Sequence, residues 1–143
     1  HMENMISKAK EMNGVGLSGV QVGDLRRMLV MKAGGRFIKV VNPIVMSSSD
    51  ETEVFEEGCL SFPALYITME RKSSVKISYQ TPLGEVVEED FEDLESAIIQ
   101  HEMDHLDGIT ILDSVSRLKQ DIYKRKIKKF MRKIKKKLKD ESL

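Results

Sequence analysis

Two histidines with metal-ligand spacing stand in the stretch HEMDHLDG, residues 101–108. His101 and His105 are four residues apart, so on a helix both imidazoles lie on one face and can bind the same ion. Glu102 completes the H-E-x-x-H pattern, which is typical of zinc hydrolases. Two ligands do not make a catalytic site, because such a metal usually takes three protein ligands and keeps one position open for water.

The third ligand has three candidates in this chain. Asp113 is a carboxylate downstream of the two histidines, and Glu141 lies in a tail that is expected to fray. Cys59 is the single cysteine, and its thiolate would be a strong ligand for zinc or ferrous iron. A lone cysteine is more often a small buried hydrophobic residue, so the side chains alone leave the choice open.

The composition fits one globular domain. The chain has 143 residues, of which 41% are hydrophobic and 32% are charged. No apolar run approaches the roughly 18 residues of a membrane span, and no signal peptide is visible. Residues 1–2 are interpreted as an expression scar plus a start methionine. A single cysteine excludes an internal disulfide and fits a reducing compartment.

The zero net charge hides a division of the chain into an acidic body and a basic tail. Residues 117–143 hold 13 of the 23 Lys and Arg but 3 of the 23 Asp and Glu. We therefore predict a catalytic domain at 3–118 and a basic amphipathic helix and tail at 119–143. The last helix is expected at about 116–139, and its apolar face would comprise Tyr123, Ile127, Phe130, Met131, Ile134 and Leu138.

The periodicity of the body predicts an α+β fold. A helix is expected at 3–12, a glycine-rich turn at 14–23, a loop at 47–52 and an extended segment at 59–63. Strands are expected at 27–32, 36–43, 74–80 and 85–90. Strands followed by one buried helix and a packing helix predict small antiparallel or mixed sheets around a central metal-binding helix, with a C-terminal helix.

The strongest helix signal surrounds the two histidines. Spacings of three and four predict one inward stripe that comprises Phe91, Leu94, Ile98, His101 and His105. We expect Asp90 to cap the helix, with Asp93 at the favourable third position, and Asp107-Gly108 to end it.

Three motifs occur in one order, GVGLSGVQ at 14–21, EGCLS at 57–61 and QHEMDHLDG at 100–108. With them, the chain from about residue 4 to residue 120 resembles the peptide deformylases. The resemblance implies a metal-dependent hydrolase of protein biosynthesis that removes the N-formyl group from the initiator methionine of nascent polypeptides and releases formate. It also implies the ligand set Cys59, His101 and His105.

The resemblance implies roles for further residues. Glu102 would be the general base and then the general acid to the leaving amine, while the Gln21 amide and the backbone N–H of Leu60 would stabilise the oxyanion. Gly16 would let the substrate approach closely. Glu57 and Arg71 would pair and brace the cysteine segment, and Asp104 and Gln100 would orient the histidines. Candidates for the methionine pocket, or alternatively plain core, are Val15, Phe55, Leu94 and Ile98.

The sequence departs from the family pattern in two places. Ser18-Gly19 stands where the motif usually has two alanines, and a glycine there is expected to loosen the backbone beside the site. Some thirty residues that usually precede the first helix of the family, and supply an edge strand, are absent.

The resemblance also implies a cofactor, a partner and a location. One divalent ion is expected, natively Fe²⁺, with Zn²⁺, Ni²⁺ or Co²⁺ as substitutes. The basic helix would contact the ribosome, or alternatively dock its apolar side on the domain, and no membrane is involved. The expected location is the cytoplasm of a bacterial or phage-infected cell, or an organellar matrix. Two alternatives are a small zinc endopeptidase that uses Asp113 as third ligand, and a ribosome- or nucleic-acid-binding module with a degenerate metal site.

Overall fold

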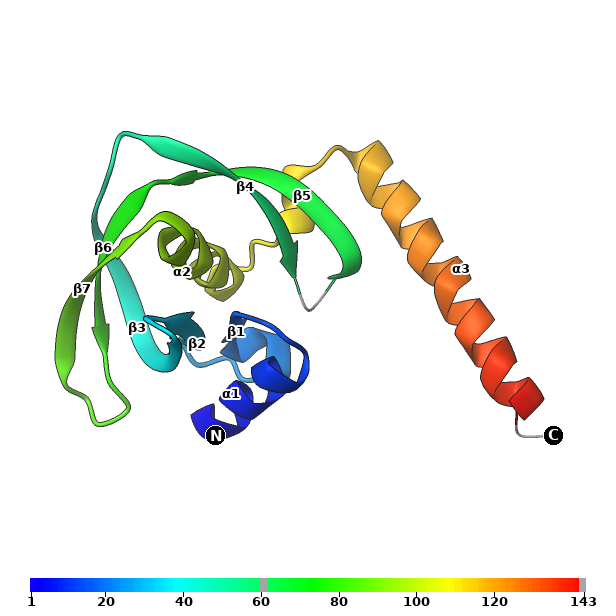
Figure 1. Cartoon of the computed structure of the whole chain (residues 1–143), viewed down its shortest axis with the longest axis horizontal. Helices are drawn as coiled ribbons and strands as arrows, with labels where there is room; N and C mark the ends of the chain where they lie inside the picture. Colours follow the sequence, from blue (N-terminus) through cyan, green and yellow to red (C-terminus); the bar gives the residue numbers. More distant parts are fainter. Residues whose placement is uncertain (60–61, 142–143) are drawn as a thin grey trace.

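The computed structural model describes residues 1–59 and 62–141, and its strands form two sheets around one helix (Figure 1). Its elements are α1 (Met2–Glu11), β1 (Gly16–Ser18), the 3-10 helix η1 (Gly19–Val22), β2 (Met28–Ala33), β3 (Arg36–Ser48), β4 (Thr52–Cys59), β5 (Phe62–Lys72), β6 (Ser74–Gln80), β7 (Val86–Glu92), α2 (Asp93–Leu106), the 3-10 helix η2 (Ile111–Ser114) and α3 (Arg117–Glu141). This combination of helices and sheets agrees with the α+β prediction.

The larger sheet has the strand order β1-β2-β3-β6-β7, and β4 and β5 form a separate two-stranded ribbon. The five strand pairings within the described residues are antiparallel. The helix α2 contacts strands of both sheets, and Figure 1 shows it enclosed between them. A helix in that position can present one face to the larger sheet and another to the ribbon.

Two clusters of buried side chains hold this arrangement together. One packs Ile98 and Ile99 of α2 against β2, β3, β6 and β7, through residues such as Met31, Ile77 and Phe91. The other packs Met5, Ile6 and Ala9 of α1 against β1 and β2. Because burial of such side chains is the main stabilising term in folding, α2 is fixed on the sheet by the residues that immediately precede His101.

The strand boundaries correct three predictions. The strand expected to end at residue 43 continues to Ser48, because a register shift between Val41 and Ile44 accommodates Pro43 as a bulge. The expected loop at 47–52 is therefore shorter. The strand β5 was predicted only as an extended segment ending at residue 63, although the exposure of its residues 65–70 alternates strictly.

The start of α2 differs from the prediction. Asp90 and Phe91 belong to β7, where they pair with Lys76 and Val75 of β6. This ladder continues to Glu92, which is the N-cap, and Asp93 then makes the corner with a φ of 52°. Strand pairing thus overrides the helix-capping signal at residue 90. Phe91 is buried, but it packs into the core as a residue of β7 and does not belong to a helical stripe.

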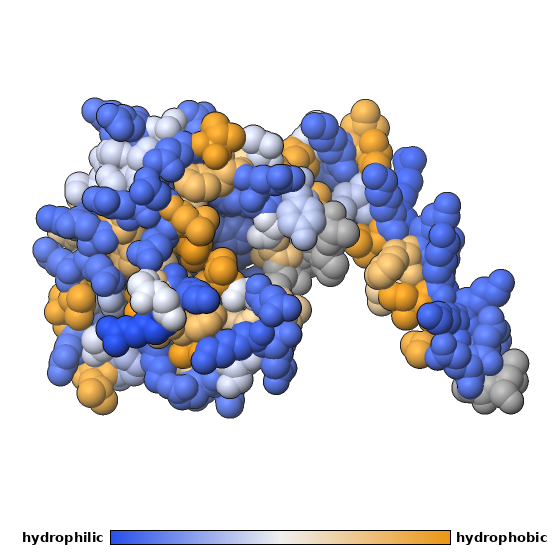
Figure 2. Space-filling view, in the orientation of Figure 1, coloured by the Kyte–Doolittle hydropathy of each residue, from blue (hydrophilic) through white to orange (hydrophobic). Residues whose placement is uncertain are grey.

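The two terminal helices match their predicted ranges closely. Met12 does not belong to the buried side of α1, since it caps the helix and is 46% exposed. α3 has no buried residue, and Leu118, Phe130, Met131 and Leu138 are each more than half exposed. Figure 2 shows hydrophobic residues along the side of α3 turned toward the body and hydrophilic residues along the other side. No helix in the described ranges is long and apolar enough to cross a membrane.

Candidate metal centre and active-site cleft

Three potential ligands converge between the end of β4 and the C-terminal half of α2. Cys59 is the last residue of β4, and His101 and His105 lie about one turn apart on α2. Their sulfur and nitrogen ligand atoms all lie within 4.8 Å of one another. The Cys59 Sγ is 3.3 Å from His105 Nε2, which is 3.1 Å from His101 Nε2. The fold therefore brings a thiol to two imidazoles, although Cys59 is more than forty residues from either histidine in the chain.

These separations fit the coordination shell of a metal ion. A tetrahedral ion with bonds of about 2.0–2.3 Å to nitrogen and sulfur holds its ligand atoms about 3.3–3.6 Å apart. Two imidazole nitrogens at 3.1 Å cannot both carry a proton on the facing side, so one proton or one cation must lie between them. One thiolate and two neutral imidazoles suit a divalent ion such as iron, nickel, cobalt or zinc.

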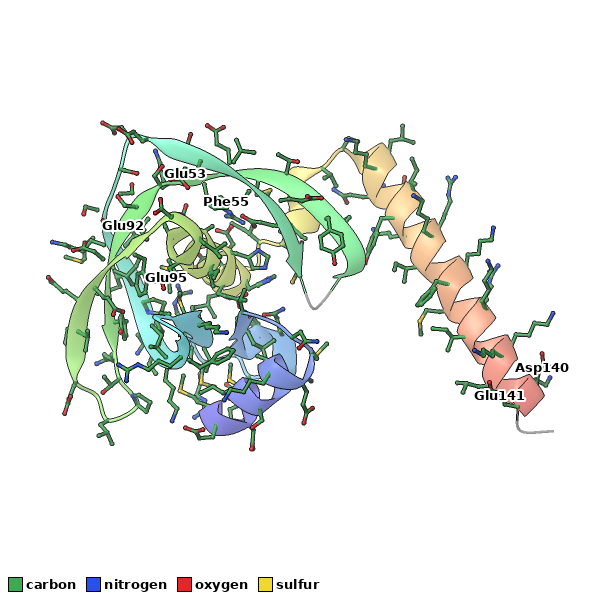
Figure 3. The ribbon with its side chains drawn as sticks, viewed as in Figure 1. Glu53, Phe55, Glu92, Glu95, Asp140 and Glu141 are labelled. Atoms are coloured by element: carbon green, nitrogen blue, oxygen red, sulfur yellow. The ribbon has the colours of Figure 1, made fainter. Side chains whose placement is uncertain are left out.

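The two carboxylates considered as a third ligand do not join this group. Asp113 lies in η2, where its Oδ2 accepts hydrogen bonds from the backbone N–H and the hydroxyl of Thr110. Glu141 lies at the far end of α3, away from α2 (Figure 3). Within residues 1–59 and 62–141, the cluster of potential ligands contains neither.

A buried ion pair between Arg71 and Glu57 contacts the Nδ1 side of His101. Arg71 on β5 donates from Nε and a terminal nitrogen to the two carboxylate oxygens of Glu57 on β4, at 2.9 and 2.8 Å. Glu57 Oε1 is also 3.0 Å from His101 Nδ1. Arg71 additionally binds Asp104 on α2. A carboxylate on Nδ1 fixes the ring so that Nε2 faces Cys59 and His105.

The charges of this cluster favour a cation among the ligands. Burial alone would raise the pKa of Glu57, but hydrogen bonds from Arg71 and His101 hold it below its ordinary value. Burial alone would lower the pKa of His101, yet its hydrogen bonds to Cys59 and Glu57 raise it to about 10. A metal ion bound at His101 Nε2 would replace a proton there beside the Cys59 thiolate, while Glu57 accepts the hydrogen bond from Nδ1.

Glu102 lies beside the ligands without joining them. It is 4% exposed, and its Oε1 is 3.8 Å from His101 Nε2. Its other oxygen, Oε2, is buried and has no hydrogen-bond partner within the described ranges. Burial raises the pKa of Glu102 to about 7, although the neighbouring His101 and His105 act to lower it. A carboxyl group of this kind can take up and release a proton near neutral pH.

Gly16 on β1 lies directly against the side chain of Glu102. A Cβ at this position would lie 3.0 Å from Glu102 Cγ and 3.3 Å from its Oε1. The sequence predicts that glycine here leaves room for a substrate. The structure adds that the missing side chain also leaves room for Glu102 itself.

The side chain of Gln21 reaches the metal centre from η1. Its Nε2 donates to the Cys59 Sγ at 3.4 Å. Its Oε1 accepts hydrogen bonds from the backbone N–H and the hydroxyl of Ser18. Leu60, which is the other predicted oxyanion donor, lies outside the described residues.

A cleft of about 550 Å³ opens beside the ligands. The predicted pocket residues all line it, and Phe55 extends from β4 toward α2 (Figure 3). Leu94 is 59% exposed, so it lies at the rim and not on an inward helical stripe, whereas Ile98 is buried. These predicted lining residues are Val15, Gly16, Phe55, Leu94 and Ile98.

Several residues of the site were not predicted. Leu65 and Tyr66 of β5 line the cleft, and they were missed because that strand was missed. Ser18 was noted only as a departure from a motif, although the S-x-x-Q spacing from Ser18 to Gln21 is a capping-box signal that could have indicated their contact. Gln100 does not contact the histidines as expected, since its side chain binds Lys72 and Ser96.

Comparisons with known proteins agree with this geometry. The family model for polypeptide deformylase matches residues 1–121. The chain is 40% identical over 134 residues to a peptide deformylase of Thermotoga maritima, covering 94% of this chain and 82% of the relative. It is 44% identical over 138 residues to one from a Caulobacter strain, covering 92% and 79%.

Two solved structures show the same architecture. The crystal structure of the Thermotoga maritima peptide deformylase superimposes with a TM-score of 0.77 at 44% identity, covering 80% of this chain and 78% of that one. A peptide deformylase structure from Legionella pneumophila gives a TM-score of 0.84 at 35% identity, covering 92% and 79%.

Proposed function

The chain belongs to the polypeptide deformylase family, and from that membership we propose how its own residues perform the family's reaction. The reaction is the metal-dependent hydrolysis of the N-formyl group of nascent polypeptides, which yields formate and a free amino terminus. The observation that supports the assignment of roles is the joint position of Cys59, His101 and His105 beside the buried carboxyl group of Glu102. The endopeptidase and nucleic-acid-module alternatives are not favoured.

Cys59, His101 and His105 would hold one divalent metal ion, and we assign ferrous iron as the native one. When bound, such an ion polarises the formyl group and makes a water molecule acidic enough to lose its proton near neutral pH. The Glu57 carboxylate would keep His101 in the tautomer with a free Nε2, and Arg71 would keep Glu57 ionised and in place. Metal analysis of protein purified without oxygen tests the iron assignment, and zinc at full occupancy in active protein would contradict it.

Glu102 would move the protons of the reaction. Its Oε2, which has no partner within the described ranges, is the atom we assign to accept a proton from the attacking water. The same carboxyl group would then donate that proton to the departing amine nitrogen, so that the C–N bond breaks and formate leaves. One group can serve both steps because burial raises its pKa from the ordinary range of a carboxyl group toward neutral pH.

Gln21 would stabilise the negative charge that develops on the carbonyl oxygen. Its Nε2 already points toward the metal centre, as its contact with Cys59 shows. The backbone N–H of Leu60 is the proposed second donor, at a position outside the described residues. Each such donor contributes about 10²–10³ to the rate in comparable enzymes.

The apolar cleft would bind the methionine side chain of the substrate. Phe55, Leu94 and Ile98 offer apolar surface between β4 and α2, and Val15 and Gly16 border the opposite side. An unbranched thioether can adapt to such an irregular apolar space. We therefore expect formyl-Met peptides to bind better than formyl-Gly peptides, with the difference seen in kcat/KM.

α3 would contact the ribosome through phosphate groups. Its lysines cover the surface outside the apolar side of a helix that has no buried residue, so they are available to a polyanion. In this proposal residues 3–118 act as the catalytic domain and 119–143 as the attachment, in a bacterial or phage-infected cytoplasm or an organellar matrix. Changing Lys133, Lys136 and Lys137 to Gln should weaken ribosome binding and its salt dependence while turnover of a formyl-Met tripeptide is kept. Unchanged ribosome affinity would contradict this role.

Formate release from a formyl-Met tripeptide tests the catalytic assignment. Protein loaded with ferrous or nickel ions should release one formate per peptide, and Glu102→Gln should keep its metal and lose nearly all turnover. An acetyl-Met tripeptide serves as the matched substrate control, and we expect it to react far more slowly. Normal turnover by a metal-loaded Glu102→Gln protein would contradict the assignment.

A further inference from the structure

We propose that Ser18 is a positioning residue, which fixes the Gln21 amide in the orientation needed to stabilise the reacting carbonyl oxygen. The proposal rests on the role assigned to Gln21 above. Ser18 is the last residue of β1 and the N-cap of η1, and Gln21 is the third residue of η1. The serine is fully buried, with 0% of its surface exposed.

Two donors from Ser18 determine which way the Gln21 amide faces. The backbone N–H of Ser18 donates to Gln21 Oε1 at 2.9 Å, and the hydroxyl of Ser18 donates to the same oxygen at 3.0 Å. A backbone N–H can only donate, so the amide oxygen must face β1 and the NH₂ group must face away from it. The NH₂ group then points at Cys59, where Nε2 lies 3.4 Å from Sγ.

The backbone N–H of Ser18 selects which way the Gln21 amide faces, and the Ser18 hydroxyl restricts its rotation further. The terminal torsion of a glutamine side chain has a broad minimum, so one donor leaves the amide plane free to turn about that contact. A second donor on the other lone pair of Oε1 restricts this turning. Donors to a developing oxyanion act over a narrow range of distance, so a turn of the plane weakens stabilisation of the transition state more than substrate binding.

A double-mutant cycle on the metal-loaded full-length chain tests this proposal. The variants are Ser18→Ala, Gln21→Ala and the double variant, and the assay is formate release from a formyl-Met tripeptide. We expect Ser18→Ala to lower kcat about fivefold, the usual effect of one neutral hydrogen bond, with KM unchanged. In the Gln21→Ala background the same change should have no effect on kcat.

Ser96→Ala is the matched control. Ser96 is also fully buried, and its hydroxyl donates to the Lys72 carbonyl, so its removal costs a comparable hydrogen bond. We expect this control to lower the thermal midpoint as much as Ser18→Ala does without lowering kcat. An NMR spectrum of the zinc-loaded protein gives a readout apart from activity, since the side-chain NH₂ signals of Gln21 should shift in Ser18→Ala and stay in place in Ser96→Ala.

The outcomes separate this proposal from the one on which it rests. If Gln21→Ala retains wild-type turnover, the role of Gln21 itself is wrong and that of Ser18 with it. If Gln21→Ala is slow but Ser18→Ala keeps a wild-type kcat, the role of Ser18 alone is overturned. An equal loss from Ser18→Ala in both backgrounds, or unchanged Gln21 NH₂ signals, would also overturn it, because either would indicate a purely structural effect.

Discussion

Gly16→Ala is expected to slow the reaction by displacing Glu102. The added Cβ would lie 3.0 Å from Glu102 Cγ, 3.2 Å from Cδ and 3.3 Å from Oε1. Non-bonded carbon atoms rest about 3.5–4.0 Å apart, so the side chain must move by roughly 0.5–1 Å. Misplacement of a catalytic group by about 1 Å can cost about 10²-fold in rate, so we expect kcat to fall between about 10- and 100-fold.

The assay measures kcat and KM for formate release, together with metal content and the thermal midpoint. Gly16 does not have a positive φ, so its backbone conformation does not strain an alanine at this position. Gly84→Ala is the control, because Gly84 has a φ of 86° and lies in the turn between β6 and β7, with no atoms near the added Cβ. That control should lose stability and keep its kcat. A Gly16→Ala protein that is fully metal-loaded and turns over at the wild-type rate would refute the reasoning.

Three further changes test other parts of the structure. Arg71→Met should lower the free energy of unfolding by about 3–5 kcal/mol in chemical denaturation, because it removes both Arg71 hydrogen bonds and the positive charge from the buried Glu57 carboxylate. Gly19→Ala should cost about 1–3 kcal/mol in the same assay, since its Cβ would lie 3.0 Å from the Asp24 carbonyl oxygen and 3.1 Å from that of Arg26. Burial and the nearby Glu89 raise the pKa of Tyr79 to about 12, which favours the neutral phenol in the folded state. Tyr79→Phe should therefore remove the tyrosinate absorbance step near pH 12, and a step that persists would contradict this.

The parts of the site that local patterns encode were predictable from the sequence. The four-residue spacing of His101 and His105 needs only helical geometry to place both imidazoles on one face. The prediction of Cys59 over Asp113 as third ligand required the order of three motifs, and the structure is consistent with it, because β4 ends beside α2 whereas the Asp113 carboxylate binds Thr110, the N-cap of η2. Four strands of the larger sheet, β2, β3, β6 and β7, also followed from residue patterns and turn signals.

Other features depend on contacts between segments that are distant in sequence. Asp90 has the residue type of a helix cap, but β6 pairs with β7 through Glu92 and delays the start of α2. The bulge at Pro43 similarly allows β3 to continue past a residue that usually ends a strand. The pairing of Glu57 with Arg71 comes from the ribbon of β4 and β5, and neither of these strands was predicted as a strand.

The contrast between α3 and α2 has the same origin. Both helices carry regularly spaced apolar residues, but only α2 is enclosed by two sheets, and α3 exposes its apolar side. Periodicity identifies a helix and its faces, while burial depends on which surfaces the rest of the chain brings to it.

X-ray absorption at the metal edge of active, metal-loaded protein measures the coordination most directly. The arrangement of Cys59 with His101 and His105 predicts one sulfur at about 2.3 Å and two imidazole nitrogens at about 2.0–2.1 Å. Cys59→Ser should remove the sulfur contribution and leave both nitrogens in place. A shell of nitrogen and oxygen alone in active wild-type protein would contradict the proposed centre.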